Sequence, residues 1–161
     1  MEEHDPKQEL KPPVAEDRAP AVESVMAIAK HPVHPMLVTF PIALLGMSPL
    51  ADLAYLWVGD GFWARAGLWL NITGLALGVV AGIVGTLDMV LVRVARRHVS
   101  AWTHFIAAVM VLCLAALGVW LRLPDPAAAV WPWGLLQSLV MAGMVLVAGW
   151  LGGSLSFHHG I

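Results

Sequence analysis

Six of the seven histidines lie beside or just inside the ends of long apolar segments, where imidazoles could bind a metal ion or a haem iron. His31 and His34 fall in "KHPVHPMLVTFP", where a polar stretch becomes apolar. The others are His98, His104, His158 and His159. Neutral imidazole is a common metal ligand and an axial ligand of haem iron. The spacing of these histidines selects no particular metal, and no C-x-x-C-H motif for covalent haem is present.

The elements that must position these histidines are membrane-spanning helices. The chain has 161 residues, of which 59% are hydrophobic and 12% are charged, whereas soluble domains carry about 25% charged residues. Four segments reach the roughly 20 apolar residues that a spanning helix needs; they cover about 35–58, 67–92, 102–121 and 133–157. None alternates as a barrel strand would. The sequence therefore predicts an all-α integral membrane protein, an up-down four-helix transmembrane bundle with short connections.

Residues 1–30 read as a separate polar tail. The stretch "MEEHDPKQELKPPVAEDRAP" is acidic and proline-containing, and it lacks the apolar core of a signal peptide. We expect it to be disordered. The following "AVESVMAIAKH" has apolar residues at helical spacing, which favours a short helix on the membrane surface, with an extension of the tail as the alternative. The predicted domains are thus the tail, 1–30, and a four-helix transmembrane domain, 31–161.

The distribution of arginines predicts the orientation. The middle connection carries Arg93, Arg96 and Arg97, whereas each outer connection has one arginine, Arg65 or Arg122. The positive-inside rule then places the middle connection and both termini in the cytoplasm, so the expected location is a cytoplasmic (inner) membrane. Most tryptophans fall near the opposite interface: Trp57, Trp63, Trp69, Trp120, Trp131 and Trp133. In this orientation the six histidines all lie at the cytoplasmic end.

The acidic residues inside the spans need partners. Asp88 and His104 lie eight residues before and after Arg96, so antiparallel helices place them at similar depth. A histidine or the arginine cluster could pair with Asp88, because an aspartate inside a bilayer is costly unless it is paired, protonated or hydrated. Asp52 lies near the level of Arg65 at the other end, which favours a structural ion pair or snorkelling. Three amide and hydroxyl residues of the outer half are expected to form hydrogen bonds between helices: Asn71, Gln137 and Ser138.

Three interpretations of the histidine cluster compete. In the first, two imidazoles bind a b-type haem, with His34, His104 and His158 placed best by depth. The propionates would then meet the arginine cluster, Arg93, Arg96 and Arg97. In the second, a metal or proton-handling site combines imidazoles with a carboxylate; its members are His34, Asp88, His104 and either His158 or His159. In the third, the histidines form hydrogen bonds to helix ends and lipid headgroups.

Four stretches carry a resemblance to a known family: "HPMLVTFPIALLGMSPLADL", "GVVAGIVGTLDMV", "HFIAAVMVL" and "GWLGGSLSFHHGI". In this order around four spans they resemble the bacterial predicted membrane protein family called domain of unknown function 2231. The resemblance covers about 31–161 and implies a four-helix membrane domain. It also implies that the family-typical polar residues are His34, Asp52, Asp88, His104 and His159, which favours His159 over His158.

One position departs from the family pattern. Relatives usually carry a second histidine in "HPMLVHFP", where this chain has Thr39. If that histidine binds a ligand in relatives, this chain lacks it or uses another, such as His31. Members of the family also occur fused to, or encoded beside, redox domains such as Rieske-type iron–sulfur proteins and dehydrogenases. The resemblance therefore implies an electron-transfer setting without establishing an activity.

The functional expectation is a redox-associated integral membrane subunit that holds haem b or another metal at the histidine cluster and passes electrons to a partner protein or quinone. The alternative is a non-catalytic membrane anchor or scaffold for a partner complex. A transporter would need polar residues through the full thickness of the bundle, and the middle of these spans is nearly all apolar. No basic patch indicates nucleic-acid binding, no catalytic triad or phosphate loop is visible, and homo- and hetero-oligomers both remain open. No internal repeat is evident along the chain.

Overall fold

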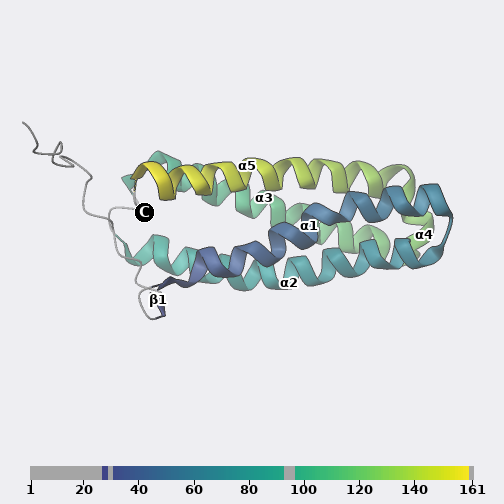
Figure 1. Ribbon diagram of the computed structural model, residues 1–161, viewed down its shortest axis with the longest axis horizontal. Helices are drawn as coiled ribbons and strands as arrows, with labels where there is room; N and C mark the ends of the chain where they lie inside the picture. Colours follow the sequence, from purple (N-terminus) through teal and green to yellow (C-terminus); the bar gives the residue numbers. More distant parts are fainter. Residues whose placement is uncertain (1–26, 29–30, 93–96, 160–161) are drawn as a thin grey trace, which may run out of the picture.

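The computed structural model describes residues 27–28, 31–92 and 97–159. Four long helices form an up-down bundle (Figure 1): α1 Val33–Val58, α2 Gly61–Leu91, α3 Val99–Arg122 and α5 Leu135–His159. The short helices α4 Pro126–Ala129 and η3 Val130–Gly134 lead into α5. The predicted all-α four-helix architecture is confirmed, and four helical segments are long and apolar enough to cross a membrane.

The helix boundaries differ from the expected ones because local caps extend the helices. Helix α2 begins earlier than predicted, at Gly61, where the Asp60 side chain accepts a hydrogen bond of 2.8 Å from the backbone N–H of Phe62. Asp125 likewise caps α4, accepting hydrogen bonds from the N–H groups of Ala127 and Ala128. The fourth spanning segment therefore begins at Pro126, not near Trp133.

The surface helix expected before the first span is absent from its described residues. Ala27–Ile28 (β1) instead pairs with His31–Pro32 (β2) as a short antiparallel ladder. Pro32 biases His31 away from helical backbone angles, which explains why no helix forms there. The rest of the predicted tail lies outside the described residues.

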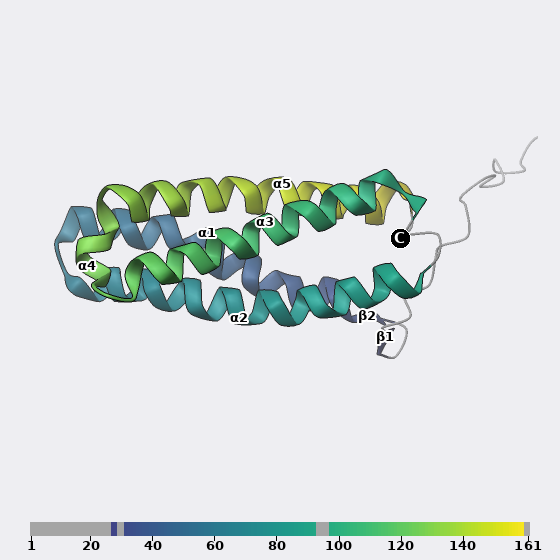
Figure 2. The ribbon, with the colours of Figure 1, turned by 180° about the vertical axis from the view of Figure 1, so that it is seen from behind.

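The packing order of the helices decides which residues can meet. Helix α1 packs against α2 and α5, and α3 packs against the same two helices. Helices α1 and α3 therefore occupy opposite corners of the bundle (Figures 1 and 2). The apolar core between the helices contains Leu45, Val111, Ala115, Met141 and Val145.

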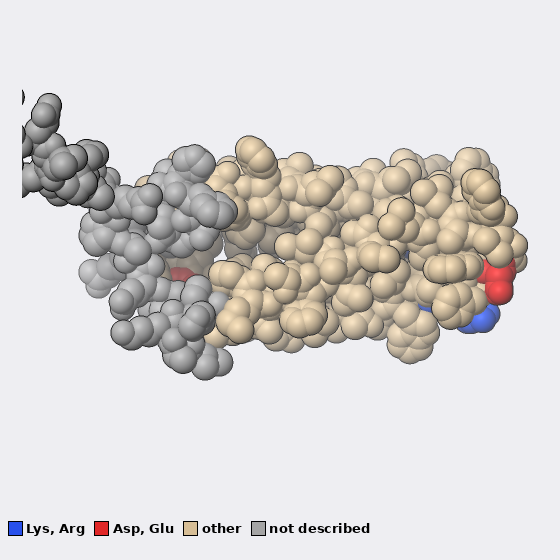
Figure 3. Space-filling view, in the orientation of Figure 1, with Lys and Arg blue, Asp and Glu red and all other residues tan. Residues whose placement is uncertain are grey.

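The outer surface of the bundle is apolar, as a bilayer requires. In Figure 3 the long side of the molecule is almost entirely uncharged, and the visible acidic and basic side chains lie near its ends. Large side chains face outward along the helices; Leu146 is 75% exposed and Trp150 is 79% exposed. A soluble monomer rarely exposes so extensive an apolar surface. The protein is therefore an integral membrane protein.

Candidate functional site

Two of the predicted histidines face each other at one end of the bundle. His34 lies in the first turn of α1, and His104 lies near the start of α3. Their ring centres are 6.3 Å apart, and the ring planes are inclined by 79°. Because α1 and α3 occupy opposite corners, this pair spans the interior of the bundle. We call this region the histidine end.

Each ring of the pair is held by the neighbouring helix. The Nδ1 atom of His34 lies 2.9 Å from the carbonyl oxygen of Ala81 on α2, and the Nδ1 atom of His104 lies 3.0 Å from the carbonyl oxygen of Ala148 on α5. A carbonyl oxygen can only accept, so both Nδ1 atoms carry the proton. The Nε2 atoms are then unprotonated acceptors in the neutral rings. Neither Nε2 bonds to another residue of the described part of the chain.

Glycines make the close approach of these rings possible. A Cβ atom on Gly85 of α2 would lie 2.7 Å from the Nδ1 and Cε1 atoms of His34. A Cβ atom on Gly152 of α5 would lie 2.9 Å from the Cε1 atom of His104. Carbon atoms pack at about 3.5–4.0 Å, so any side chain at either position would displace the ring. The two glycines therefore fix where the imidazoles sit.

The ring centres of His34 and His104 are close enough for both imidazoles to contact one ligand from two diagonal helices. The rings themselves meet edge to face. A Cβ atom on Gly85 would lie 3.2 Å from the Nε2 atom of His34, so this nitrogen lies beside α2.

Two other predicted site residues, Asp88 and Arg97, lie at the same end of the bundle as the pair. Asp88 is half-buried on α2, one turn beyond Gly85, and Arg97 is exposed before α3. Within the described residues, no three histidine, cysteine, aspartate or glutamate side chains gather closely enough to hold a metal ion. The remaining predicted residues have side chains outside the described part: His31, Arg93, Arg96, His158 and His159.

A second buried polar centre lies at the opposite end and was only partly foreseen. Asp52 forms an ion pair with Arg122, not with Arg65, which is exposed. The Nη2 atom of Arg122 lies 2.6 Å from the Oδ2 atom of Asp52, and both side chains are 0% exposed. The sequence prediction placed Arg122 in a loop, but it is the last residue of α3 and points into the bundle. We call this region the ion-pair end.

Hydrogen bonds connect this ion pair to α3, η3 and α5. Ser138 donates to the Oδ2 atom of Asp52 at 2.6 Å. Arg122 donates to the Oε1 atom of Gln137 at 2.7 Å and to the carbonyl oxygens of Gly118 and Gly134. A buried ion pair needs such additional bonds, because both charges lose their hydration.

The predicted interhelical bonds of the outer half are confirmed. Asn71 donates to the Oγ atom of Ser48 on α1 at 2.8 Å, and Gln137 donates to the carbonyl oxygen of Leu114 on α3 at 2.8 Å. Three buried polar atoms here lack a hydrogen-bond partner among the described residues: the Oδ1 atoms of Asp52 and Asn71 and the Nε atom of Arg122. The ion-pair end is thus a dense polar centre in an apolar bundle.

The two polar centres are too far apart to act on one ligand. Two helical segments join the two centres, one from His34 to Asp52 and one from His104 to Arg122. Each segment is about 27 Å long at a rise of about 1.5 Å per residue. This length is close to the roughly 30 Å thickness of a bilayer core. The histidine end and the ion-pair end therefore lie near opposite membrane interfaces.

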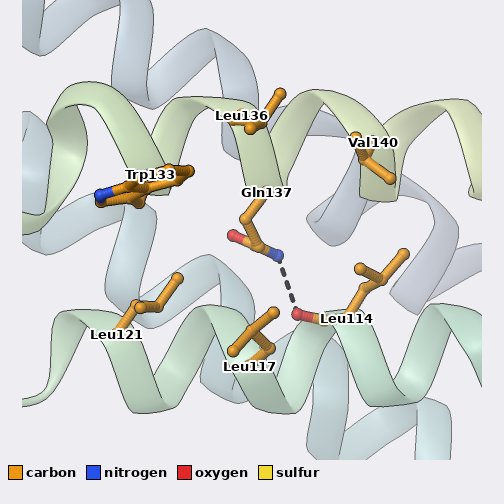
Figure 4. A pocket seen from close by; sticks show the side chains of 7 residues that line it. All are labelled: Leu114, Leu117, Leu121, Trp133, Leu136, Gln137 and Val140. Carbon is orange, nitrogen blue, oxygen red and sulfur yellow. Dashed lines mark hydrogen bonds between the residues drawn. The ribbon is translucent and has the colours of Figure 1, made fainter.

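An outward-facing groove of about 320 Å³ lies between α3 and α5 (Figure 4). Its lining is Leu114, Leu117, Leu121, Trp133, Leu136, Gln137 and Val140. The only amide among these residues turns its nitrogen to the carbonyl oxygen of Leu114. The groove therefore offers a ligand little beyond apolar contact, which suits a lipid chain.

The apolar surface, the four spanning helices and the polar centres at both ends define a four-helix integral membrane protein. The chain belongs to the predicted membrane protein family DUF2231, whose family model matches residues 30–161. That match confirms the resemblance drawn from the four sequence stretches. No match was found among curated proteins or among solved structures.

Proposed function

We propose that the protein is a redox-associated membrane subunit that holds a b-type haem between His34 and His104. The observation that carries the proposal is the pair of inward-facing imidazoles on diagonal helices, whose ring centres are 6.3 Å apart. Each ring has its Nδ1 proton committed to a backbone carbonyl of the adjacent helix. Metal-binding histidines almost always donate their second N–H in this way, which fixes the tautomer and orients the ring.

Two imidazoles from the chain would suffice to hold a haem, because a haem brings four nitrogen ligands of its own. Zinc sites use three or four protein ligands, so a zinc-type site here would need Asp88 or His159 in addition to the pair.

The surroundings of the pair support the same assignment. The rings approach the interior beside Gly85 and Gly152, where no side chain competes for the space. Arg97 lies at the same end and is exposed, and with Arg93 and Arg96 it would provide cations for carboxylate groups. When bound, a haem supplies one-electron transfer. We place this end at the cytoplasmic face, on the positive-inside argument, within reach of a redox partner protein or a quinone.

The roles of the chain's own residues follow from these contacts. His34 and His104 would bind the iron through Nε2. The carbonyl groups of Ala81 and Ala148 would keep Nδ1 protonated and increase the basicity of the rings. The apolar bundle would exclude water and so set the reduction potential.

The test is a reduced-minus-oxidised visible spectrum of the full-length protein purified in detergent after expression with haem available. Haem and metals are quantified on the same sample. We expect sharp reduced-state bands at about one haem per chain, lost in His34→Ala and in His104→Ala. His98→Ala is the matched control, because His98 lies at the same end but outside the pair, and it should keep the bands.

Two outcomes would contradict the proposal. If folded wild-type protein gives a flat spectrum and contains no stoichiometric metal, neither haem nor another metal is bound, and the anchor or scaffold function remains. If His98→Ala loses the bands and His104→Ala keeps them, the cofactor lies elsewhere.

A further inference from the structure

The contacts at the histidine end occur twice, once in each helical hairpin. In the first hairpin His34 of α1 bonds to Ala81 of α2 and lies against Gly85. In the second, His104 of α3 bonds to the carbonyl oxygen of Ala148 on α5, and its ring lies against Gly152. The two partner segments read "AGIVG" at 81–85 and "AGWLG" at 148–152. Each histidine therefore meets the same motif at the same place.

The correspondence continues to the ion-pair end. The separation along the chain from His34 to Asp52 equals the separation from His104 to Arg122. The partner helices agree as well. The number of residues from Gly67 to Ala81 on one helix equals the number from Gly134 to Ala148 on the other. A Cβ atom on Gly67 would lie 3.1 Å from the Oδ1 atom of Asp52.

The second ion-pair residue makes the matching contact. A Cβ atom on Gly134 would lie 3.3 Å from the Nη2 atom of Arg122. Asn71 and Ser138 both donate hydrogen bonds at the ion-pair end. The separation from Asn71 to Ala81 equals the separation from Ser138 to Ala148. The two members of the ion pair thus occupy corresponding positions in the two hairpins and carry opposite charges.

The apolar core between the two ends shows complementary sizes at corresponding positions. Leu45 on α1 fills the space beside Gly74 on α2. At the corresponding positions of the second hairpin stand Ala115 and Met141, so the large residue is on the second helix instead of the first. Leu45, Ala115 and Met141 pack in one cluster. Each hairpin therefore pairs one large residue with one small residue, but on opposite helices, which explains why the repeat is hard to see in the sequence.

We infer that the bundle is an internal dimer of two corresponding hairpins, 33–91 and 99–159, related by a two-fold axis along the bundle, and that Asp52 and Arg122 fix their pairing. Both hairpins run in the same direction, as in parallel repeats of membrane proteins. Two copies of either hairpin would bring two carboxylates or two guanidinium groups together in the buried interior. The opposite charges favour the pairing of unlike hairpins, and the like charges act against the alternatives.

This inference does not depend on a bound cofactor. If the proposed haem is present, however, the same axis passes between His34 and His104, and a ligand there meets two equivalent surroundings. The axis thus connects the candidate site to the ion pair that holds the hairpins together.

The test exchanges the charges across the axis in the full-length protein. The variants are Asp52→Arg, Arg122→Asp and the double variant D52R/R122D, and the readout is the thermal midpoint in detergent. Each single variant should lose roughly 10 °C or more, because it buries two like charges. The double variant should recover most of the loss, since it restores a pair of opposite charges at the two corresponding positions.

A control exchange tests whether the recovery depends on corresponding positions or only on contact between the two exchanged residues. R122Q/Q137R swaps two residues that are also hydrogen-bonded, at 2.7 Å, but that occupy non-corresponding positions. This variant should stay destabilised. The inference is overturned if D52R/R122D remains as unstable as the single variants, and equally if R122Q/Q137R recovers to the same extent. Because the readout is stability of the chain alone, absence of haem would leave the result unaffected.

Discussion

An alanine at Gly152 should destabilise the protein, whereas an alanine at the adjacent Gly153 should not. A Cβ atom at 152 would lie 2.9 Å from the Cε1 atom of His104, but a Cβ atom at 153 would meet nothing within 4 Å. Carbon atoms pack at about 3.5–4.0 Å, so the His104 ring must move by about 0.6 Å or more. That movement strains the hydrogen bond from His104 to Ala148, now 3.0 Å long.

The magnitude follows from opposing contributions. Overpacking costs about 1–3 kcal/mol, and loss of the hydrogen bond costs about 0.5–1.5 kcal/mol. Replacing glycine by alanine within a helix contributes about 0.8–1.0 kcal/mol in the other direction. We therefore expect Gly152→Ala to lose about 2 kcal/mol and Gly153→Ala to gain up to about 1 kcal/mol. The two thermal midpoints should then differ by roughly 5–12 °C.

The assay is thermal unfolding of both variants and the wild type in one detergent, followed by tryptophan fluorescence. Gly85→Ala repeats the test on the other ring, because a Cβ atom there would lie 2.7 Å from His34. Equal midpoints for Gly152→Ala and Gly153→Ala would show that His104 is not held against α5, and would remove the geometric basis of the candidate site.

Three further substitutions test separate contacts in the same thermal assay. Arg122→Met should cost about 3–5 kcal/mol, because Asp52 would keep a buried charge without its cation; a loss below about 1 kcal/mol would contradict a structural role for this ion pair. Ser138→Ala should cost about 1.5–3 kcal/mol, since it removes a hydrogen bond of 2.6 Å to a carboxylate, and an unchanged midpoint would contradict that bond. Thr39→His introduces the histidine that the family resemblance leads us to expect at this position. Residue 39 is exposed on α1, so the free energy of unfolding should change by less than about 0.5 kcal/mol. A gain in haem content would show that position 39 reaches the site.

The positions of the histidines in the sequence predict the end of the bundle at which they lie, but not which of them are in contact. The sequence places six histidines at one end of four spans, but depth alone does not tell which of them meet. The structure brings His34 and His104 together because α1 and α3 occupy opposite corners of the bundle and both rings turn inward. The motif that holds each ring, an alanine carbonyl followed four residues later by a glycine, is present twice in the sequence and becomes recognisable only when the contacts are compared.

Hydropathy and length by themselves determined the four spans, the up-down order and the apolar exterior, because a bilayer requires about 20 apolar residues per helix and leaves few alternatives. The partner of Asp52 was decided by the tertiary structure. Sequence proximity to the membrane surface suggested Arg65, yet the last turn of α3 carries Arg122 into the interior, where only a second buried charge and several carbonyl groups can compensate for lost hydration. The packing of all four helices decides which helices are diagonal, and therefore which charges and rings face each other. A local sequence pattern does not contain this information.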